Sequence, residues 1–300
     1  MIFRNIISIA FSICLCFSCQ TKSKDKKEPA EEPVVKKESS IAFDFEHPAK
    51  RWALSDSLLE VSGIAWTGEN KIMAIEDFRP LLYNLSLGDS LATITEKIPF
   101  KETSKEKYDI EDLALIKDTV FALYSHGKLF KIWTEKKKLM VDEIKLDLDK
   151  ANNTEGLAYD PVTGNLLIAC KNESAMEDEK KSTRSVFEFD TKSNILKPEP
   201  FLLIHEKEFK EVAGEKIQFF PSAIAVHPAT HDIYVMSTKE TKCLAQFTHE
   251  GQLKAFSYLD KEMLPQPEGI CFDSNGNLYI STEGRHGKPA YIYKFLPKNQ

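Results

Sequence analysis

The chain has 300 residues, enough for one large domain or two of ordinary size. Hydrophobic residues at 42% and charged residues at 29% are the proportions of a globular protein. The formal net charge is −6 and the lysines are interleaved with acids, which argues against a nucleic-acid partner because phosphate binding needs clustered Lys and Arg.

The first element is an apolar run that follows a single Arg, in MIFRNIISIAFSICLCFSC. The run is too short for a membrane span, and it predicts a signal peptide over residues 1–18. The stretch CFSC resembles a bacterial lipobox, with a serine directly before Cys19. We therefore expect lipidation at Cys19; an ordinary secretory signal is the alternative.

The second element, residues 19–40, has almost no apolar side chain to bury, mixes both signs of charge and contains two prolines. This composition predicts a disordered tether. A globular domain over residues 41–300 would then hang from a bacterial membrane by the lipid on Cys19. We expect a cell-envelope protein on the extracytoplasmic side.

One phrase then occurs five times: an apolar strand, a tight turn and a second apolar strand. The copies span residues 61–77, 109–127, 153–173, 220–240 and 267–284. Equivalent positions near their starts are 49, 44, 67 and 46 residues apart, and they are Ser62, Glu111, Glu155, Ser222 and Glu268. Self-similarity at such a period indicates a repeat architecture.

Further short strands between the copies, such as SVFEFD at 185 and CLAQFT at 243, bring each unit to four strands. No segment shows helical periodicity, so the sequence predicts an all-β, five-bladed β-propeller. The tail after Glu268 supplies only three strands, and we expect an N-terminal strand within residues 41–61 to close the last blade. The long interval between the third and fourth copies leaves six blades as an alternative.

The two ends of each hairpin lie on the same rim, so the hairpins predict one charged mouth of the central channel. The candidate metal ligands are Glu111, Glu155 and Glu268. The other residues that we place at the mouth are Glu76, Asp77, His126, Lys171, Glu173, Glu240 and Glu283. Carboxylate oxygens without His or Cys suit Ca²⁺ or Mg²⁺ better than zinc. Alternatively, the glutamates accept backbone N–H bonds from neighbouring blades.

The phrases SGIAW, EDLAL, TEGLAYDPVTGNLLIACKNE and PQPEGICFD with LYISTE resemble the SdiA-regulated (YjiK or CarP) family of bacterial envelope β-propellers. The resemblance covers roughly residues 52–296, and it implies a calcium-linked propeller distantly similar to gluconolactonase-type and phytase-like propellers. Two stretches depart from the family pattern by lacking acids, 124–126 (Tyr-Ser-His) and 237–239 (Ser-Thr-Lys).

Three functions follow as hypotheses. The first is a calcium-linked binding or envelope-homeostasis protein. The second is a metal-dependent hydrolase of the lactonase, esterase or phytase type, although the chain has no GxSxG, HExxH or Gly-rich phosphate loop. The third is a platform that binds another envelope protein at its rim loops. We expect a monomer that meets an envelope protein or a small ligand at the mouth.

Overall fold

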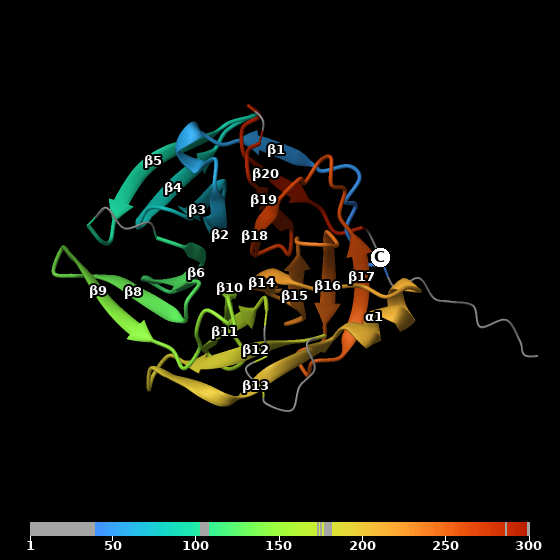
Figure 1. The fold of residues 1–300 in the computed structure, drawn as a ribbon. Coiled ribbons are helices and arrows are strands. Elements are labelled where there is room, and N and C mark those ends of the chain that lie inside the picture. Colours follow the sequence, from blue (N-terminus) through green and yellow to red (C-terminus); the bar gives the residue numbers. More distant parts are fainter. Residues whose placement is uncertain are drawn as a thin grey trace, which may run out of the picture. The chain divides into compact units, whose positions relative to one another are not determined.

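The computed structural model describes residues 40–102, 108–172, 174, 176, 182–285 and 287–298. The predicted signal peptide, Cys19 and nearly all of the predicted tether lie outside these residues. In the described part, five four-stranded antiparallel sheets form the blades of a five-bladed β-propeller (Figure 1). The predicted fold class is confirmed, and the alternative of six blades is not.

The first three blades each use four strands that are consecutive in the chain. Blade 1 holds β2 (Val61–Gly68), β3 (Lys71–Glu76), β4 (Leu81–Leu87) and β5 (Ala92–Pro99). Blade 2 holds β6 (Ile110–Ile116), β7 (Thr119–Tyr124), β8 (Lys128–Glu135) and β9 (Lys138–Lys145). Blade 3 holds β10 (Thr154–Asp160), β11 (Asn165–Cys170), β12 (Thr183–Asp190) and β13 (Ile195–His205).

Blade 4 follows the same plan, and blade 5 is closed from the other end of the domain. Blade 4 holds β14 (Pro221–Val226), β15 (Ile233–Ser237), β16 (Cys243–Phe247) and β17 (Leu253–Tyr258). Blade 5 holds β18 (Pro267–Phe272), β19 (Leu278–Thr282), β20 (Tyr291–Phe295) and β1 (Lys50–Ala53), in the order β1-β20-β19-β18. The N-terminal strand therefore completes the last blade, as the sequence predicts.

The innermost strands β2, β6, β10, β14 and β18 pack against one another around the centre (Figure 1). Each of the five buried hydrophobic clusters lies between two neighbouring blades, because each sheet buries both of its faces. The blades are thus held as a ring by apolar side chains, and the channel ends of the inner strands are brought to one rim.

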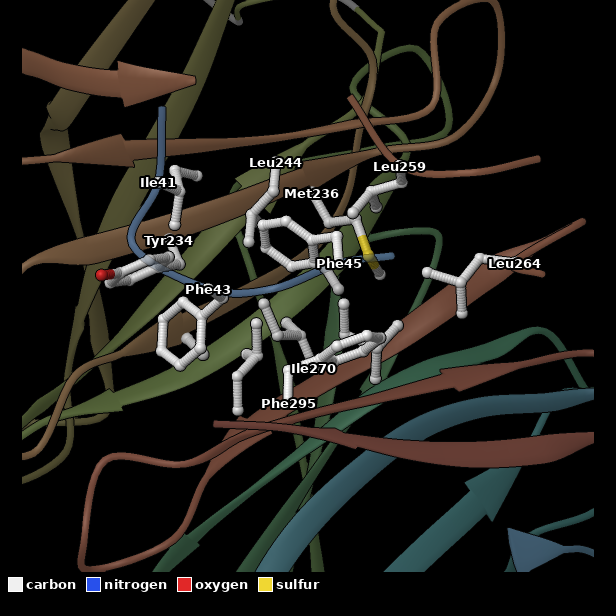
Figure 2. Close-up of a cluster of buried hydrophobic side chains, with 14 of the residues drawn as sticks. Ile41, Phe43, Phe45, Tyr234, Met236, Leu244, Leu259, Leu264, Ile270 and Phe295 are labelled. Carbon is white, nitrogen blue, oxygen red and sulfur yellow. The ribbon is translucent and has the colours of Figure 1, made fainter. Parts of the chain in front are cut away.

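An N-terminal segment adds to the closure between blades 4 and 5. Ile41, Phe43 and Phe45 are buried in the cluster that joins these blades (Figure 2). The backbone of this segment is also held, because Lys298 N–H donates to the carbonyl of Ala42 over 2.8 Å. The chain entering the propeller and the chain leaving it are therefore tied together.

The described residues include one α-helix, α1 (Glu206–Ala213), and one 3-10 turn, η1 (Asp56–Leu58). The sequence did not predict α1, which lies in the long interval between the third and fourth repeat phrases. The helix is kept in place by Phe209, whose ring stacks on Phe219 with centroids 4.7 Å apart. It ends at Gly214, which takes the left-handed conformation with φ 79°. No described helix has the length and apolar character needed to span a membrane.

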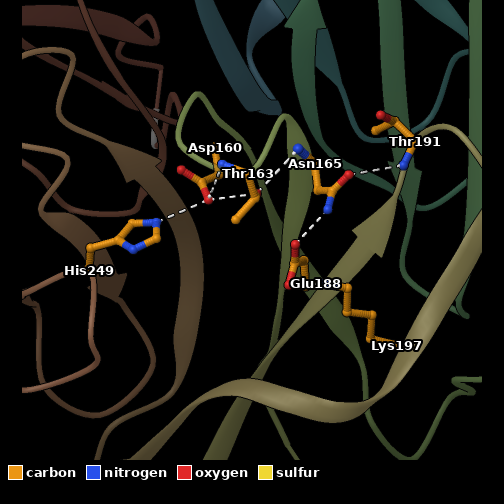
Figure 3. A network of polar contacts seen from close by, with 7 residues as sticks. All are labelled: Asp160, Thr163, Asn165, Glu188, Thr191, Lys197 and His249. Carbon is orange, nitrogen blue, oxygen red and sulfur yellow. Dashed lines mark hydrogen bonds and ion pairs between the residues drawn. The ribbon is translucent and has the colours of Figure 1, made fainter.

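A polar network lies at the rim opposite the predicted mouth and connects blade 3 to blade 4 (Figure 3). His249, which follows β16, contacts the carboxylate of Asp160 over 3.0 Å. Asp160 also accepts a 2.7 Å hydrogen bond from Thr163, and these bonds hold its pKa below the ordinary value despite its burial. The two ends of the inner strands thus differ, because this end is locked by paired groups.

Candidate cation site at the channel mouth

All five inner strands carry a β-bulge near the residue at which their pairing with the second strand of the blade begins. The register of every inner hairpin skips one residue, and the skipped residues are Ser62, Glu111, Glu155, Ser222 and Glu268. A bulge leaves one residue out of the ladder and re-aims its side chain. These are the equivalent positions of the five repeat phrases, so the repeated phrase encodes a repeated bulge at the mouth.

The residue after each bulge is small in four of the five blades: Gly63, Gly156, Ala223 and Gly269. A Cβ atom added at Gly63 would lie 2.5 Å from Oδ1 of Asp112 and 2.8 Å from its Cα. Glycine is needed here because the inner strand of the next blade approaches this closely. The inner strands therefore meet tightly just inside the bulges.

Three carboxylates converge on the side of the mouth formed by blades 1 and 2. One oxygen each of Asp77, Asp109 and Glu111 lies within 4.8 Å of the other two. All three residues are half-buried. The main chain fixes them, since Ile110 N–H donates to the carbonyl of Asp77 over 3.0 Å. We call this group the acidic triad.

The carboxylates of the acidic triad are electrostatically unfavourable to one another. Burial, with the nearby charges of Asp109 and Glu283, raises the pKa of Asp77 to about 7. Burial also raises the pKa of Glu111 well above its ordinary value, with Glu155 and Asp109 adding to the effect. Oδ1 of Asp77 is buried and has no hydrogen-bond partner among the described residues. These features are those of a site that a cation would stabilise.

Glu155, beside the triad, is already paired. Its carboxylate lies 2.9 Å from the ammonium of Lys171, and it accepts a hydrogen bond from the side-chain amide of Asn153. Only 4% of Glu155 is exposed, and burial raises its pKa although Lys171 opposes that rise. Lys171 therefore neutralises one member of the predicted ligand set.

Glu268 and Glu283 lie on the blade 5 side of the mouth. Burial raises the pKa of Glu268 to about 8, against the opposing charge of Lys171. Burial and the charge of Glu60 raise the pKa of Glu283 to about 7. Of the three glutamates predicted as ligands, the structure thus places Glu111 in the triad, Glu155 against Lys171, and Glu268 in a separate half-buried position.

The remaining predicted mouth residues take several positions. Glu76 is buried in blade 1, where it pairs with Arg79 and accepts a 3.1 Å hydrogen bond from Phe78 N–H. His126 is exposed, and its Nε2 lies 3.8 Å from Oδ2 of Asp109. Glu240 is exposed in the segment after β15. Glu173 lies outside the described residues.

Sequence reasoning missed two aspartates on β6 or directly before it. Asp109 completes the triad and accepts a hydrogen bond from the hydroxyl of Ser125. The available signal was the spacing in DIED, because residues two apart in a strand share a face. Asp112 occupies the position at which the other four blades have Gly or Ala, and comparing the five phrases would have singled it out.

Asp112 is the carboxylate that ties one blade to the next. It is 1% exposed, and its two oxygens accept 2.8 Å hydrogen bonds from the backbone N–H groups of Leu113 and of Leu157 in blade 3. Burial raises its pKa well above the ordinary value, although both bonds oppose that rise. Below it the channel opens into a cavity of about 160 Å³ lined by apolar side chains of all five inner strands.

Known proteins support the fold and assign the family. The sequence profile of the SdiA-regulated family matches residues 39–295. The chain belongs to the SdiA-regulated family. The resemblance that the repeat phrases carry is thereby confirmed, and the match includes all five blades of the propeller. No curated protein matches this SdiA-regulated chain.

A solved structure shares the architecture of this SdiA-regulated protein at low sequence identity. Glutaminyl cyclase of Myxococcus xanthus has a TM-score of 0.58 at 11% identity, over 83% of this chain and 95% of its own. A gluconolactonase of Xanthomonas campestris has a TM-score of 0.46 at 13% identity, over 79% of this chain and 72% of its own. At 11% identity the likeness to the glutaminyl cyclase concerns the fold alone.

Proposed function

We propose that the protein is an extracytoplasmic, membrane-anchored β-propeller that binds Ca²⁺ at its channel mouth through Asp77, Asp109 and Glu111. The observation that carries the proposal is the convergence of three carboxylate oxygens within 4.8 Å on a frame fixed by β3 and β6. We infer a binding protein of the cell envelope, with the ion as part of its folded structure.

The chemistry of the donors supports a hard cation. Ca²⁺ is bound by carboxylate, carbonyl and water oxygens, whereas zinc and copper favour His and Cys. The triad offers oxygen ligands alone, and the neighbouring His126 is exposed and lies against Asp109. A bound divalent ion would offset the repulsion that raises the pKa values of Asp77 and Glu111.

Ca²⁺ suits this mouth better than Mg²⁺ for a reason of geometry. Mg²⁺ demands a near-ideal octahedron at short distances, whereas Ca²⁺ accepts irregular sets of six to eight oxygens. The three carboxylates of the triad come from two blades, and water oxygens would complete the coordination shell. Bound calcium would thus join blade 1 to blade 2 at the rim.

The N-terminal sequence supports the proposed location at the membrane. The lipobox-like CFSC, the acceptor Cys19 and the polar segment up to residue 40 together favour a lipid anchor and a flexible tether. A propeller held in this way presents its mouth to the extracytoplasmic compartment as a monomer. There it would meet a small ligand or another envelope protein.

A melting experiment tests the proposal. Binding to the folded state alone adds about 2.7 kcal/mol to the free energy of unfolding at a ligand concentration 100 times Kd. For a domain of this size, that corresponds to a rise in Tm of about 5–10 °C. We expect this rise with Ca²⁺ in the wild type and its reversal by a chelator.

The variant Asp77→Asn with Glu111→Gln should lose this calcium response while remaining folded. The matched control is Asp118→Asn with Glu135→Gln, which removes the same charge from exposed positions of blade 2. The control should respond as the wild type does. A Tm that stays constant across millimolar calcium in the wild type would overturn the proposal.

A further inference from the structure

A second cavity, separate from the acidic triad, lies at the mouth between blades 3, 4 and 5. Its volume is about 490 Å³, within the range of small-molecule sites. Lys171, Lys239, Lys242 and Arg285 all line it, together with three amide side chains and Thr238. Almost every polar group in this lining donates hydrogen bonds, so the cavity is suited to a ligand made of acceptors.

Two of the cations are held in place by neighbours that leave their charge available. The ammonium of Lys242 donates to the carbonyl of Thr238 over 3.0 Å, and Thr238 is 6% exposed. The ammonium of Lys239 lies 4.8 Å from the centre of the Phe220 ring. Neither contact supplies a negative charge, because one partner is a neutral carbonyl and the other an aromatic face.

The cations that line the cavity outnumber the acids that line it. Lys171 is paired with Glu155. No described carboxylate lies within ion-pair distance of Lys239 or Lys242, whereas the charge of Arg285 acts on the nearby carboxylate of Glu283. The single acid in the lining is Glu268, whose pKa burial raises to about 8. Even with Glu268 ionised, the cations Lys239, Lys242 and Arg285 outnumber the one acid in the lining.

We propose that this cavity binds the phosphate group of a small soluble molecule, with Lys239, Lys242 and Arg285 as its counter-charges. Lysine ammonium groups act as point charges on phosphate, and the arginine fork can take two of its oxygens. The inference goes beyond calcium binding, because none of these residues belongs to the triad.

Calorimetric titration of the full, detergent-solubilised chain with inorganic phosphate tests the site. The buffer is depleted of metal and kept at fixed ionic strength with chloride, so that the result does not depend on calcium. The wild type should bind phosphate, and Lys239→Gln with Lys242→Gln and Arg285→Gln should weaken binding about tenfold or more. The control Lys71→Gln with Lys138→Gln and Lys192→Gln removes three exposed cations from turns at the opposite rim and should bind as the wild type does.

A second variant covers a failure of the first to fold. Lys239→Gln with Arg285→Gln changes only exposed residues, so its Tm should match that of the wild type while its phosphate affinity still falls. Equal affinity in the wild type and in both mouth variants would overturn the proposal. Binding of phosphatidic acid micelles without binding of soluble phosphate would also overturn it.

The test of phosphate binding can be told apart from the test of calcium binding. The variant Asp77→Asn with Glu111→Gln should bind phosphate as tightly as the wild type or more tightly, since it removes negative charge from the same rim. If calcium fails to bind anywhere, the phosphate titration still decides this inference. If that variant loses phosphate binding, the cavity is not independent of the triad and the inference falls.

Discussion

Glu111 and Asp112 are adjacent in the chain, yet their carboxylates do different work. The bulge turns Glu111 toward Asp77 and Asp109, where charge is concentrated and no backbone donor of a neighbouring blade reaches it among the described residues. Asp112 points the other way and accepts the N–H of Leu157 from blade 3. Glu111 thus adds negative charge that a cation would offset, and Asp112 holds blades 2 and 3 together.

Replacing Asp112 separates these roles. Asp112→Ala leaves the N–H of Leu157 buried without its acceptor, so the free energy of unfolding should fall by about 1–3 kcal/mol. The same substitution at exposed Asp118 should change it by less than about 0.5 kcal/mol. Chemical denaturation measures both, and the calcium response of Asp112→Ala should persist. A loss at Asp112 no larger than that at Asp118 would show that the interblade bond contributes nothing.

At the scale of the elements, the strands near the N-terminus close the ring twice. β1 completes blade 5 by pairing with β20, and the preceding segment inserts Ile41, Phe43 and Phe45 between blades 4 and 5 (Figure 2). Contacts between residues so far apart in sequence form only when the ring is complete. Closure therefore depends on a segment that precedes every repeat.

Truncation measures this dependence. A chain beginning at Ser40 should melt close to the full chain, whereas one beginning at Leu59 lacks both closing segments and should melt far lower. Within the full chain, Phe43→Ala should cost about 3–5 kcal/mol, because it empties a buried position. Val162→Ala, at an exposed turn, serves as the control. Equal Tm values for the two truncated chains would remove the closure argument.

The local chemistry of the strands and turns made the elements and the five bulge positions predictable. The phrase containing Glu155 and the phrase containing Glu268 are similar enough to reveal both the hairpin and its special second position. The side-chain contacts between blades were harder to predict from the sequence, because they depend on which blades are neighbours and on how deep each side chain lies. Asp109 and Asp112 were missed for this reason. Helix α1 was missed because it is held by tertiary contacts of Phe209 with Phe219 and with Phe256 of β17, which short-range periodicity does not reveal.

For the whole molecule, the two rims of the propeller differ in how their charges are balanced. The rim shown in Figure 3 pairs its buried acids, as in the contact between Asp160 and His249. At the mouth, the three carboxylates of the acidic triad lie together on the side of blades 1 and 2, and the cavity between blades 3, 4 and 5 is lined by more cations than acids. A propeller held by a lipid on Cys19 could present this unbalanced rim to the extracytoplasmic space.

The anchor itself is tested by fractionation. Cys19→Ala removes the thiol that directly follows the predicted signal peptide and is the expected lipid acceptor, so the protein should move from the membrane to the soluble fraction. Mass spectrometry of the wild type should detect acyl chains at that residue. A variant that still sediments with membranes, or a wild type without lipid, would exclude the anchor.

The most direct test of the central claim is a calorimetric titration of the metal-free protein with Ca²⁺. We predict one ion for each chain in the wild type, and no binding in Asp77→Asn with Glu111→Gln. Binding should persist in Glu155→Gln with Glu268→Gln, because neither residue belongs to the acidic triad. Absence of binding in the wild type, or its loss only in the Glu155 and Glu268 variant, would contradict a calcium site built on Asp77, Asp109 and Glu111.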